Sequence, residues 1–190
     1  MSTTVQGART RAAILDRAVD LASAEGLEGL TIGRLAAELQ MSKSGLFAHF
    51  GSKQDLQLAV VDAAAQRFRE AVIDPASRAP DGARRLRAMT AAYIADLEST
   101  GNSGGCFWAA TSAEYDDRPG PVRDAIASSL DAWLGELERQ ARVAGVAEPE
   151  RLAFELYALV MGANARFRLS GDRRVFSYAR ESAEALLGQV

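Results

Sequence analysis

The chain has 190 residues, of which 48% are hydrophobic and 25% are charged. This composition can bury a sizeable core and excludes a disordered chain. One cysteine, Cys106, excludes an internal disulfide, and one histidine, His49, leaves little for a metal site, so we expect no metal and no cofactor. The formal net charge of -3 excludes a protein that coats nucleic acid through overall charge.

Charged residues interrupt every hydrophobic stretch within a turn or two. None approaches the roughly 20 apolar residues of a membrane-spanning helix. The N-terminal segment MSTTVQGART lacks the apolar centre of a signal peptide. We therefore expect a cytoplasmic protein that has no membrane partner.

Apolar residues recur at helical spacing along most of the chain, and no stretch shows the sustained alternation of a β-strand. Glycine, proline and capping residues divide this pattern into nine segments. We predict an all-α protein with helices over residues 9–25, 31–39, 43–50, 53–73, 82–97, 106–115, 121–145, 149–169 and 173–188.

The segment TIGRLAAELQMSKSGLFAHF, residues 31–50, predicts two short helices joined by a tight turn. Ser42 is a good N-cap for the second helix, and Leu46, Phe47 and Phe50 form its apolar side. Small and polar side chains on its other side can approach base edges in a major groove. They belong to Lys43, Ser44, Gly45, Ala48 and His49.

This segment, with the SKQDL that begins at Ser52, resembles the N-terminal DNA-binding domain of bacterial TetR-type (tetracycline-repressor-like) regulators. The resemblance implies an N-terminal three-helix helix-turn-helix DNA-binding head over residues 1–52. It also implies a six-helix C-terminal ligand-binding and dimerisation body over residues 53–190. Two positions depart from the commoner family pattern. Gln40 stands where the turn often has Gly, so we expect a left-handed or strained backbone there, and Phe47 stands where Tyr is usual.

The resemblance also implies which residues contact DNA. In the family fold, positively charged helix ends converge on the backbone of one half-site, while ordinary surface charge is the alternative for each single residue. Ser44 and Gly45 stand where the family places contacts near bases, and we expect His49 near DNA. The expected DNA-binding residues are Thr31, Arg34, Lys43, Ser44, Gly45, Phe47, His49 and Lys53.

Residues 104–126, GGCFWAATSAEYDDRPGPVRDAI, resemble a subset of these regulators whose ligands are mostly unassigned. A pocket inside the body would be lined by the fourth to eighth helices and would take a largely apolar ligand. Plain core packing is the alternative for each lining residue. For Cys106 we expect a small buried side chain, with a redox-sensing thiol as the alternative. The expected ligand-binding residues are Phe68, Met89, Tyr93, Phe107, Trp108, Thr111, Trp133, Tyr157 and Asn164.

The last two predicted helices, 149–169 and 173–188, would by the same resemblance pair with their copies in a second subunit as a four-helix bundle. Their apolar residues exceed what one helix face needs, although the same residues are compatible with a monomer core. A homodimer is favoured because two heads about 34 to 36 Å apart can read a pseudo-palindrome.

We therefore predict a sequence-specific transcriptional regulator that binds a double-stranded DNA operator. It would act as a ligand-responsive repressor that leaves a pseudo-palindromic operator when a small-molecule effector binds the body. The alternative is a helical small-molecule-binding protein with impaired DNA binding. We do not expect an enzyme, because acidic pairs such as Asp116 and Asp117 have no base, nucleophile or metal partner at a convincing spacing.

Overall fold

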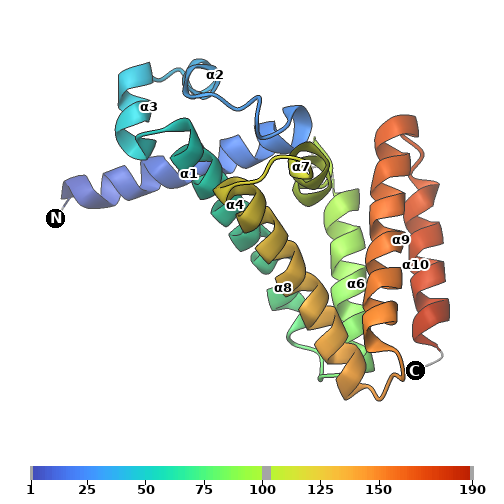
Figure 1. Ribbon diagram of the computed structural model, residues 1–190. Coiled ribbons are helices and arrows are strands. Elements are labelled where there is room, and N and C mark those ends of the chain that lie inside the picture. Colours follow the sequence, from blue (N-terminus) through green and yellow to red (C-terminus); the bar gives the residue numbers. More distant parts are fainter. Residues whose placement is uncertain (1, 100–103, 189–190) are drawn as a thin grey trace. The chain divides into compact units, whose positions relative to one another are not determined.

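The computed structural model describes residues 2–99 and 104–188, with side chains described from residue 6 onward. Every regular element in these ranges is helical (Figure 1), which confirms the predicted all-α fold with its helix-turn-helix head. None of the helices in these ranges carries an apolar stretch that could cross a membrane. The elements are α1 (Ser2–Glu25), α2 (Ile32–Glu38), α3 (Lys43–Phe50), α4 (Lys53–Phe68), the π-helix η1 (Arg69–Ile73), α5 (Asp74–Ala76), α6 (Ala83–Glu98), α7 (Phe107–Tyr115), α8 (Pro121–Val143), α9 (Pro149–Ser170) and α10 (Arg174–Leu187).

Hydroxyl caps fix where the helices of the head begin. The Thr31 hydroxyl accepts the backbone N–H of Arg34 at 3.0 Å and opens α2. The Ser42 hydroxyl accepts the N–H of Gly45 at 3.1 Å and opens α3. Both caps satisfy amide groups that a helix start otherwise leaves unpaired, and both confirm the predicted boundaries.

The turn between α2 and α3 has the expected left-handed residue. Gln40 has a φ of 54°, and it is the one non-glycine residue with positive φ in the described part of the chain. A side chain at such a position crowds the following carbonyl, which is why glycine is usual there.

The fourth helix departs from its prediction. We expected one helix to run from residue 53 to residue 73 and a break at Pro75, but α4 ends at Phe68 and the chain stays helical to Ala76. Pro75 has no N–H, and in a regular helix its ring would clash with the carbonyl four residues earlier. The π-helix η1 precedes this proline, with the N–H of Asp74 donating to the carbonyl of Arg69.

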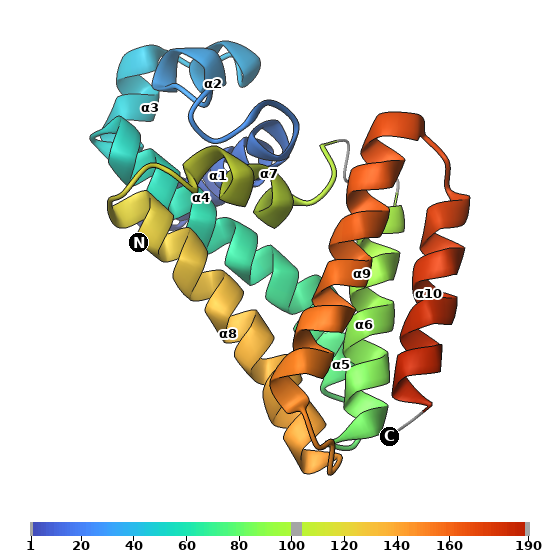
Figure 2. The same cartoon turned by 45° about the vertical axis from the view of Figure 1, so that its right-hand side comes forward.

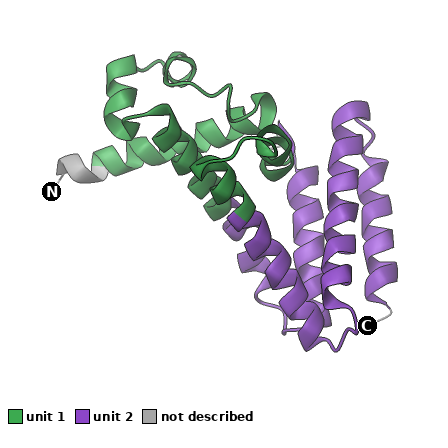
Figure 3. Cartoon of the chain, in the orientation of Figure 1, with its two compact units in different colours: residues 1–66, 106–127 green, residues 67–105, 128–190 purple. Residues whose placement is uncertain are grey.

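The chain forms two compact units (Figure 3): residues 1–66 with 106–127, and residues 67–105 with 128–190. In the second unit α6, α9 and α10 lie side by side (Figure 2). The units differ from the expected division after residue 52, because most of α4 and all of α7 belong to the first unit. The functional division after residue 52 stays a prediction.

Candidate nucleic-acid interface and ligand site

The helix α3 has a buried back and an exposed front. Leu46 and Phe50, one turn apart, are 0% and 6% exposed, whereas Phe47 is 54% exposed. Lys43 and Ser44 are exposed on the first turn of the helix. We expected Phe47 on the apolar side, and this was wrong, because one residue of a helix turns the side chain by about 100° away from Leu46. The exposed front therefore combines a cation, a hydroxyl and an aromatic ring.

Three further residues of the predicted interface have structural tasks of their own. Thr31 caps α2, and Gly45 leaves room for the Ser42 cap, since a Cβ on Gly45 would lie 3.0 Å from the Ser42 hydroxyl oxygen. His49 is half-buried, and its ring centroid is 6.2 Å from that of Phe50. The two caps explain Thr31 and Gly45 without requiring DNA.

The guanidinium of Arg34 is held by two carboxylates of the head. It donates to Glu25 at 2.9 Å and to Glu38 at 3.4 Å, and Glu38 also accepts Arg17. These bonds lower the pKa of Glu25, mainly through Arg34, and that of Glu38, mainly through Arg17. Because Arg34 and Glu25 are exposed and Glu38 is only half-buried, the pairs of Arg34 are weak and exchange readily. Arg34 can reach a phosphate only by leaving them.

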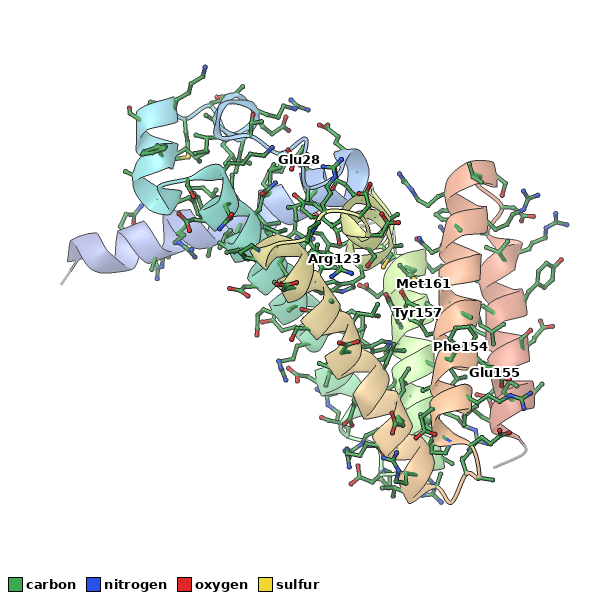
Figure 4. The ribbon with its side chains drawn as sticks, viewed as in Figure 1. Glu28, Arg123, Phe154, Glu155, Tyr157 and Met161 are labelled. Atoms are coloured by element: carbon green, nitrogen blue, oxygen red, sulfur yellow. The ribbon has the colours of Figure 1, made fainter. Side chains whose placement is uncertain are left out.

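Lys53 is paired in a similar way. Its ammonium donates to Glu28, which also accepts the Tyr115 hydroxyl at 3.0 Å and the Gln57 amide at 3.3 Å. Figure 4 labels Glu28 in this part of the first unit. The hydrogen bond from Lys53 is the largest cause that lowers the pKa of Glu28. Burial, followed by the hydrogen bond to Glu28, raises the pKa of the Tyr115 hydroxyl. Gln57 and Tyr115 are buried, so this network ties the start of α4 to α7.

Glu114 on α7 binds the turn between α1 and α2. Its carboxylate accepts the backbone N–H of Leu27 at 2.6 Å and that of Glu28 at 3.1 Å. Gly26 has a φ of +88°, and a Cβ there would lie 2.6 Å from a Glu114 carboxylate oxygen. Glycine therefore allows both the turn and the close approach of the carboxylate. Sequence reasoning missed Glu114, because no periodicity or motif links residues so far apart.

Three of the predicted ligand-binding residues form an aromatic cluster, which we define as Phe68, Tyr93 and Trp133. The ring centroids are 4.8 Å apart for Phe68 and Tyr93, 4.9 Å for Phe68 and Trp133, and 5.5 Å for Tyr93 and Trp133. All three pairs are nearly perpendicular, an edge-to-face arrangement that favours aromatic packing. Met89 is 1% exposed on α6, one turn before Tyr93. On α9, Tyr157 is half-buried and Asn164 is buried.

The other predicted ligand-binding residues belong to the first unit. Phe107 and Trp108 are buried on α7 with their rings edge to face at 5.1 Å, and Thr111 donates to the carbonyl of Phe107 at 2.9 Å. The Cys106 sulfur accepts the N–H of Ala109 at 3.4 Å as a cap of α7, and Cys106 is 4% exposed. Cys106 is therefore a small buried residue, as we expected.

Residues 14–60 match the family described as "Bacterial regulatory proteins, tetR family", and residues 82–183 match the one described as "Tetracyclin repressor-like, C-terminal domain". The second match alone spans more than half of the chain. The chain belongs to the TetR family. No curated protein sequence matches it at a significant level.

Solved structures of TetR-family regulators have the same fold. SCO4454 from Streptomyces coelicolor is 28% identical with a TM-score of 0.83, and the alignment covers 97% of this chain and 90% of that one. A TetR regulator from Chloroflexus aurantiacus is 24% identical with a TM-score of 0.86, over 97% and 96% of the two chains. AibR, solved in complex with isovaleryl coenzyme A and operator DNA, is 23% identical with a TM-score of 0.73, over 95% and 97%.

Membership of the TetR family makes the chain a DNA-binding transcriptional regulator with a ligand-binding C-terminal domain, and not an enzyme. The segment of residues 31–50 is therefore the helix-turn-helix of a TetR-family head.

The helix α9 carries an exposed apolar face. Phe154 is 66% exposed, and Tyr157 and Met161 are half-buried on successive turns of the same helix (Figure 4). By contrast, Val160 and Phe176 are 2% and 0% exposed inside the second unit. The structure thus separates the apolar residues that complete the unit from those that remain on its surface. A shallow groove of about 270 Å³ between α9 and α10 is lined by Ala158, Leu159, Gly162, Ala163, Arg166, Val175, Tyr178, Ala179 and Ser182.

Proposed function

We propose that this TetR-family regulator is a repressor that binds a pseudo-palindromic operator as a homodimer and leaves it when a largely apolar small molecule binds. The observation that carries the proposal is the surface of α3, on which Lys43, Ser44 and Phe47 are exposed while Leu46 and Phe50 of the same helix are buried. A recognition helix needs such a front, because its side chains must reach base edges while its back fixes its position in the head.

The exposed face of α9 supports the dimer. Phe154 exposes a large apolar surface, and exposed Gly162, about two helical turns further on, leaves space for a second helix to approach. Burial of such a face against a second copy removes apolar surface from water. Two heads on one dimer then bind two half-sites about one turn of DNA apart.

The aromatic cluster supports an effector with a large apolar part. Rings and Met89 supply an apolar lining, and ligand sites in proteins are mostly lined in this way. The effector acts by binding one conformation of the dimer more tightly than the other, which shifts the population away from the conformation that fits the operator.

One observation favours a second candidate function, that of a ligand-binding protein whose head binds DNA weakly. Arg34 and Lys53, both expected to hold phosphates, are paired with carboxylates of their own chain. If these pairs persist against DNA, each lost phosphate contact removes part of the electrostatic attraction.

Selection of bound duplexes from a random DNA pool, with purified protein at moderate salt, tests the proposal. Enrichment of a pseudo-palindrome is the expected result. Lys43→Ala should then weaken binding to all duplexes and reduce its salt dependence, whereas Ser44→Ala should change which sequence is preferred. A folded dimer that enriches no sequence, with and without candidate effectors, would favour the second candidate.

A further inference from the structure

Two buried polar atoms in the described part of the second unit lack a hydrogen-bond partner. Trp133 is 7% exposed and Thr90 is 4% exposed. Neither the indole nitrogen Nε1 of Trp133 nor the hydroxyl oxygen of Thr90 has a partner among the residues that the structure describes. Native proteins pair most of their buried polar atoms, so each exception calls for an explanation.

The unpaired hydroxyl of Thr90 is unusual, because the backbone of a helix can itself accept such a hydrogen bond. A Ser or Thr inside a helix can donate to the carbonyl four residues earlier. Thr111 does so to Phe107 at 2.9 Å, and Ser23 does so to Val19 at 2.8 Å. Thr90 makes no such bond within α6, so its hydroxyl is left for a partner outside the helix backbone.

Both atoms belong to the surroundings of the aromatic cluster. Thr90 precedes Tyr93 by three residues, so the two share one face of α6. The Trp133 ring stands at 88° to the Tyr93 ring with the centroids 5.5 Å apart. One polar atom therefore comes from α6, on the face that carries Tyr93, and the other comes from the Trp133 ring on α8.

The backbone beside the cluster is irregular as well. The π-helix η1 begins directly after Phe68 and packs against α6. Short π-helical turns within helices are rare and are frequent at functional sites. Phe68 itself keeps part of its surface exposed although it packs against two rings. The aromatic cluster is therefore not fully enclosed at Phe68.

We propose that the effector carries a neutral hydrogen-bond acceptor, such as a ketone, ester, lactone or amide carbonyl, which accepts from Trp133 Nε1 and Thr90 while its apolar part covers the aromatic cluster. This inference rests on the proposed function, because it names the chemical class of the ligand that the body binds. An indole N–H can only donate, so the ligand must accept. A charged group would lose its hydration among the rings without a described counter-charge at either atom, so the acceptor is neutral.

Nuclear magnetic resonance of the full-length protein tests this inference directly. The protein has two tryptophans, so ¹⁵N labelling gives two indole N–H signals, and Trp108→Phe assigns them. The probes are 4-phenylbutan-2-one and butylbenzene, which differ only by a carbonyl in place of a methylene. We expect the ketone, and not the hydrocarbon, to move the Trp133 indole proton downfield, and to bind roughly two- to tenfold more tightly, the range that one neutral hydrogen bond supplies.

Thr90→Val keeps the shape of the side chain and removes the hydroxyl. It should reduce the preference for the ketone without lowering the melting temperature, because no bond is lost in the free protein. The matched control, Ser23→Ala, removes a buried hydroxyl that does have a partner, so it should lower the melting temperature and leave the preference for the ketone unchanged.

Two results would overturn the inference: an unmoved Trp133 indole signal at the solubility limit of the ketone, or equal affinities for the two probes. A fall in melting temperature for Thr90→Val that equals the fall for Ser23→Ala would show that the hydroxyl is already paired. None of these readouts depends on DNA. A failure to select an operator would therefore count against the proposed function alone.

Discussion

Lys53 donates its ammonium to Glu28, the same carboxylate that accepts the hydroxyl of buried Tyr115. A residue expected to hold a DNA phosphate is thus neutralised by its own chain. The head can place Lys53 on a phosphate only if the ammonium leaves Glu28, and the cost of that exchange is part of the affinity for DNA.

Replacement of Glu28 by Gln should strengthen binding to DNA. The change removes a negative charge from the partner of Lys53, so the ammonium becomes available to a phosphate at less cost. We expect a several-fold tighter complex and a steeper dependence of affinity on salt, measured by fluorescence anisotropy at several salt concentrations. Asp131→Asn, which changes the net charge equally at an exposed site on α8, is the control. Equal effects of the two variants would show that net charge alone is responsible.

Glu114→Gln should destabilise the protein by about 1–2 kcal/mol, because an amide oxygen can replace only part of a carboxylate that accepts two backbone N–H groups. Gly26→Ala should lower the free energy of unfolding by about 1–2 kcal/mol, because alanine is strained in the left-handed backbone conformation of this residue. The loss should be larger still, because the new methyl group displaces the Glu114 carboxylate. Urea denaturation measures both. The double variant should lose less than the sum of the two single losses, since both disturb one contact. Strict additivity would exclude the coupling.

The stability of the protein should fall in acid through the carboxylates of the head. The pKa of Glu28 is lowered from its ordinary value of 4.5, so the folded state binds fewer protons than the unfolded state near that pH. The contribution of Glu28 to stability is present above the pKa that this residue has in the unfolded state. It is lost as the pH falls through the lower pKa of Glu28 in the folded state. Urea midpoints at pH 6 and pH 4 should therefore differ less for Glu28→Gln than for the unchanged protein. An equal difference would assign the acid sensitivity to other carboxylates.

Phe154→Glu should dissociate the proposed dimer. The side chain is 66% exposed on α9, so the free subunit tolerates the change, whereas burial of a carboxylate against a second copy is unfavourable. We expect the dimer dissociation constant, measured by analytical ultracentrifugation, to rise by about tenfold or more, since a buried unpaired charge costs several kcal/mol. Val143→Glu, at a similarly exposed apolar residue on α8, should leave the dimer intact. A dimer that survives Phe154→Glu would place the interface elsewhere.

Gln40→Gly should stabilise the head by about 0.5–1 kcal/mol, because glycine adopts the positive φ of this turn without a steric cost. Thermal melting measures the gain, and the DNA salt dependence should not change. A lower melting temperature would mean that the Gln40 side chain contributes a contact that outweighs the backbone strain.

The helices could be predicted from the sequence because capping and periodicity are local. Ser42, Gly51 and Pro121 lie where helices begin or end, and each acts within a few residues of itself. We expected Phe47 both on the apolar side of its helix and among the DNA-binding residues, and its exposure contradicts the first expectation and leaves the second a prediction. Its hydrophobicity suggested burial, but an interface residue on a recognition helix can be apolar and exposed.

The contacts that organise the candidate sites could not be predicted, because they join residues far apart in the chain. Glu114 and Leu27 are 87 positions apart, and neither segment has a sequence feature that predicts the contact. The aromatic cluster was partly foreseen, since Phe68, Tyr93 and Trp133 were all candidates, but the sequence could not show that Phe107 and Trp108 belong to the first unit instead.

The carboxylate of Glu114 has a consequence for recombining regulators of this kind. A chimera that exchanges only residues 1–52 would carry the Leu27 and Glu28 amides into a protein whose α7 was shaped by a different head. The graft would keep its recognition helix and lose the support of the turn before it. A functional transplant of operator specificity therefore has to carry α7 along with the head, or restore an acidic residue at position 114.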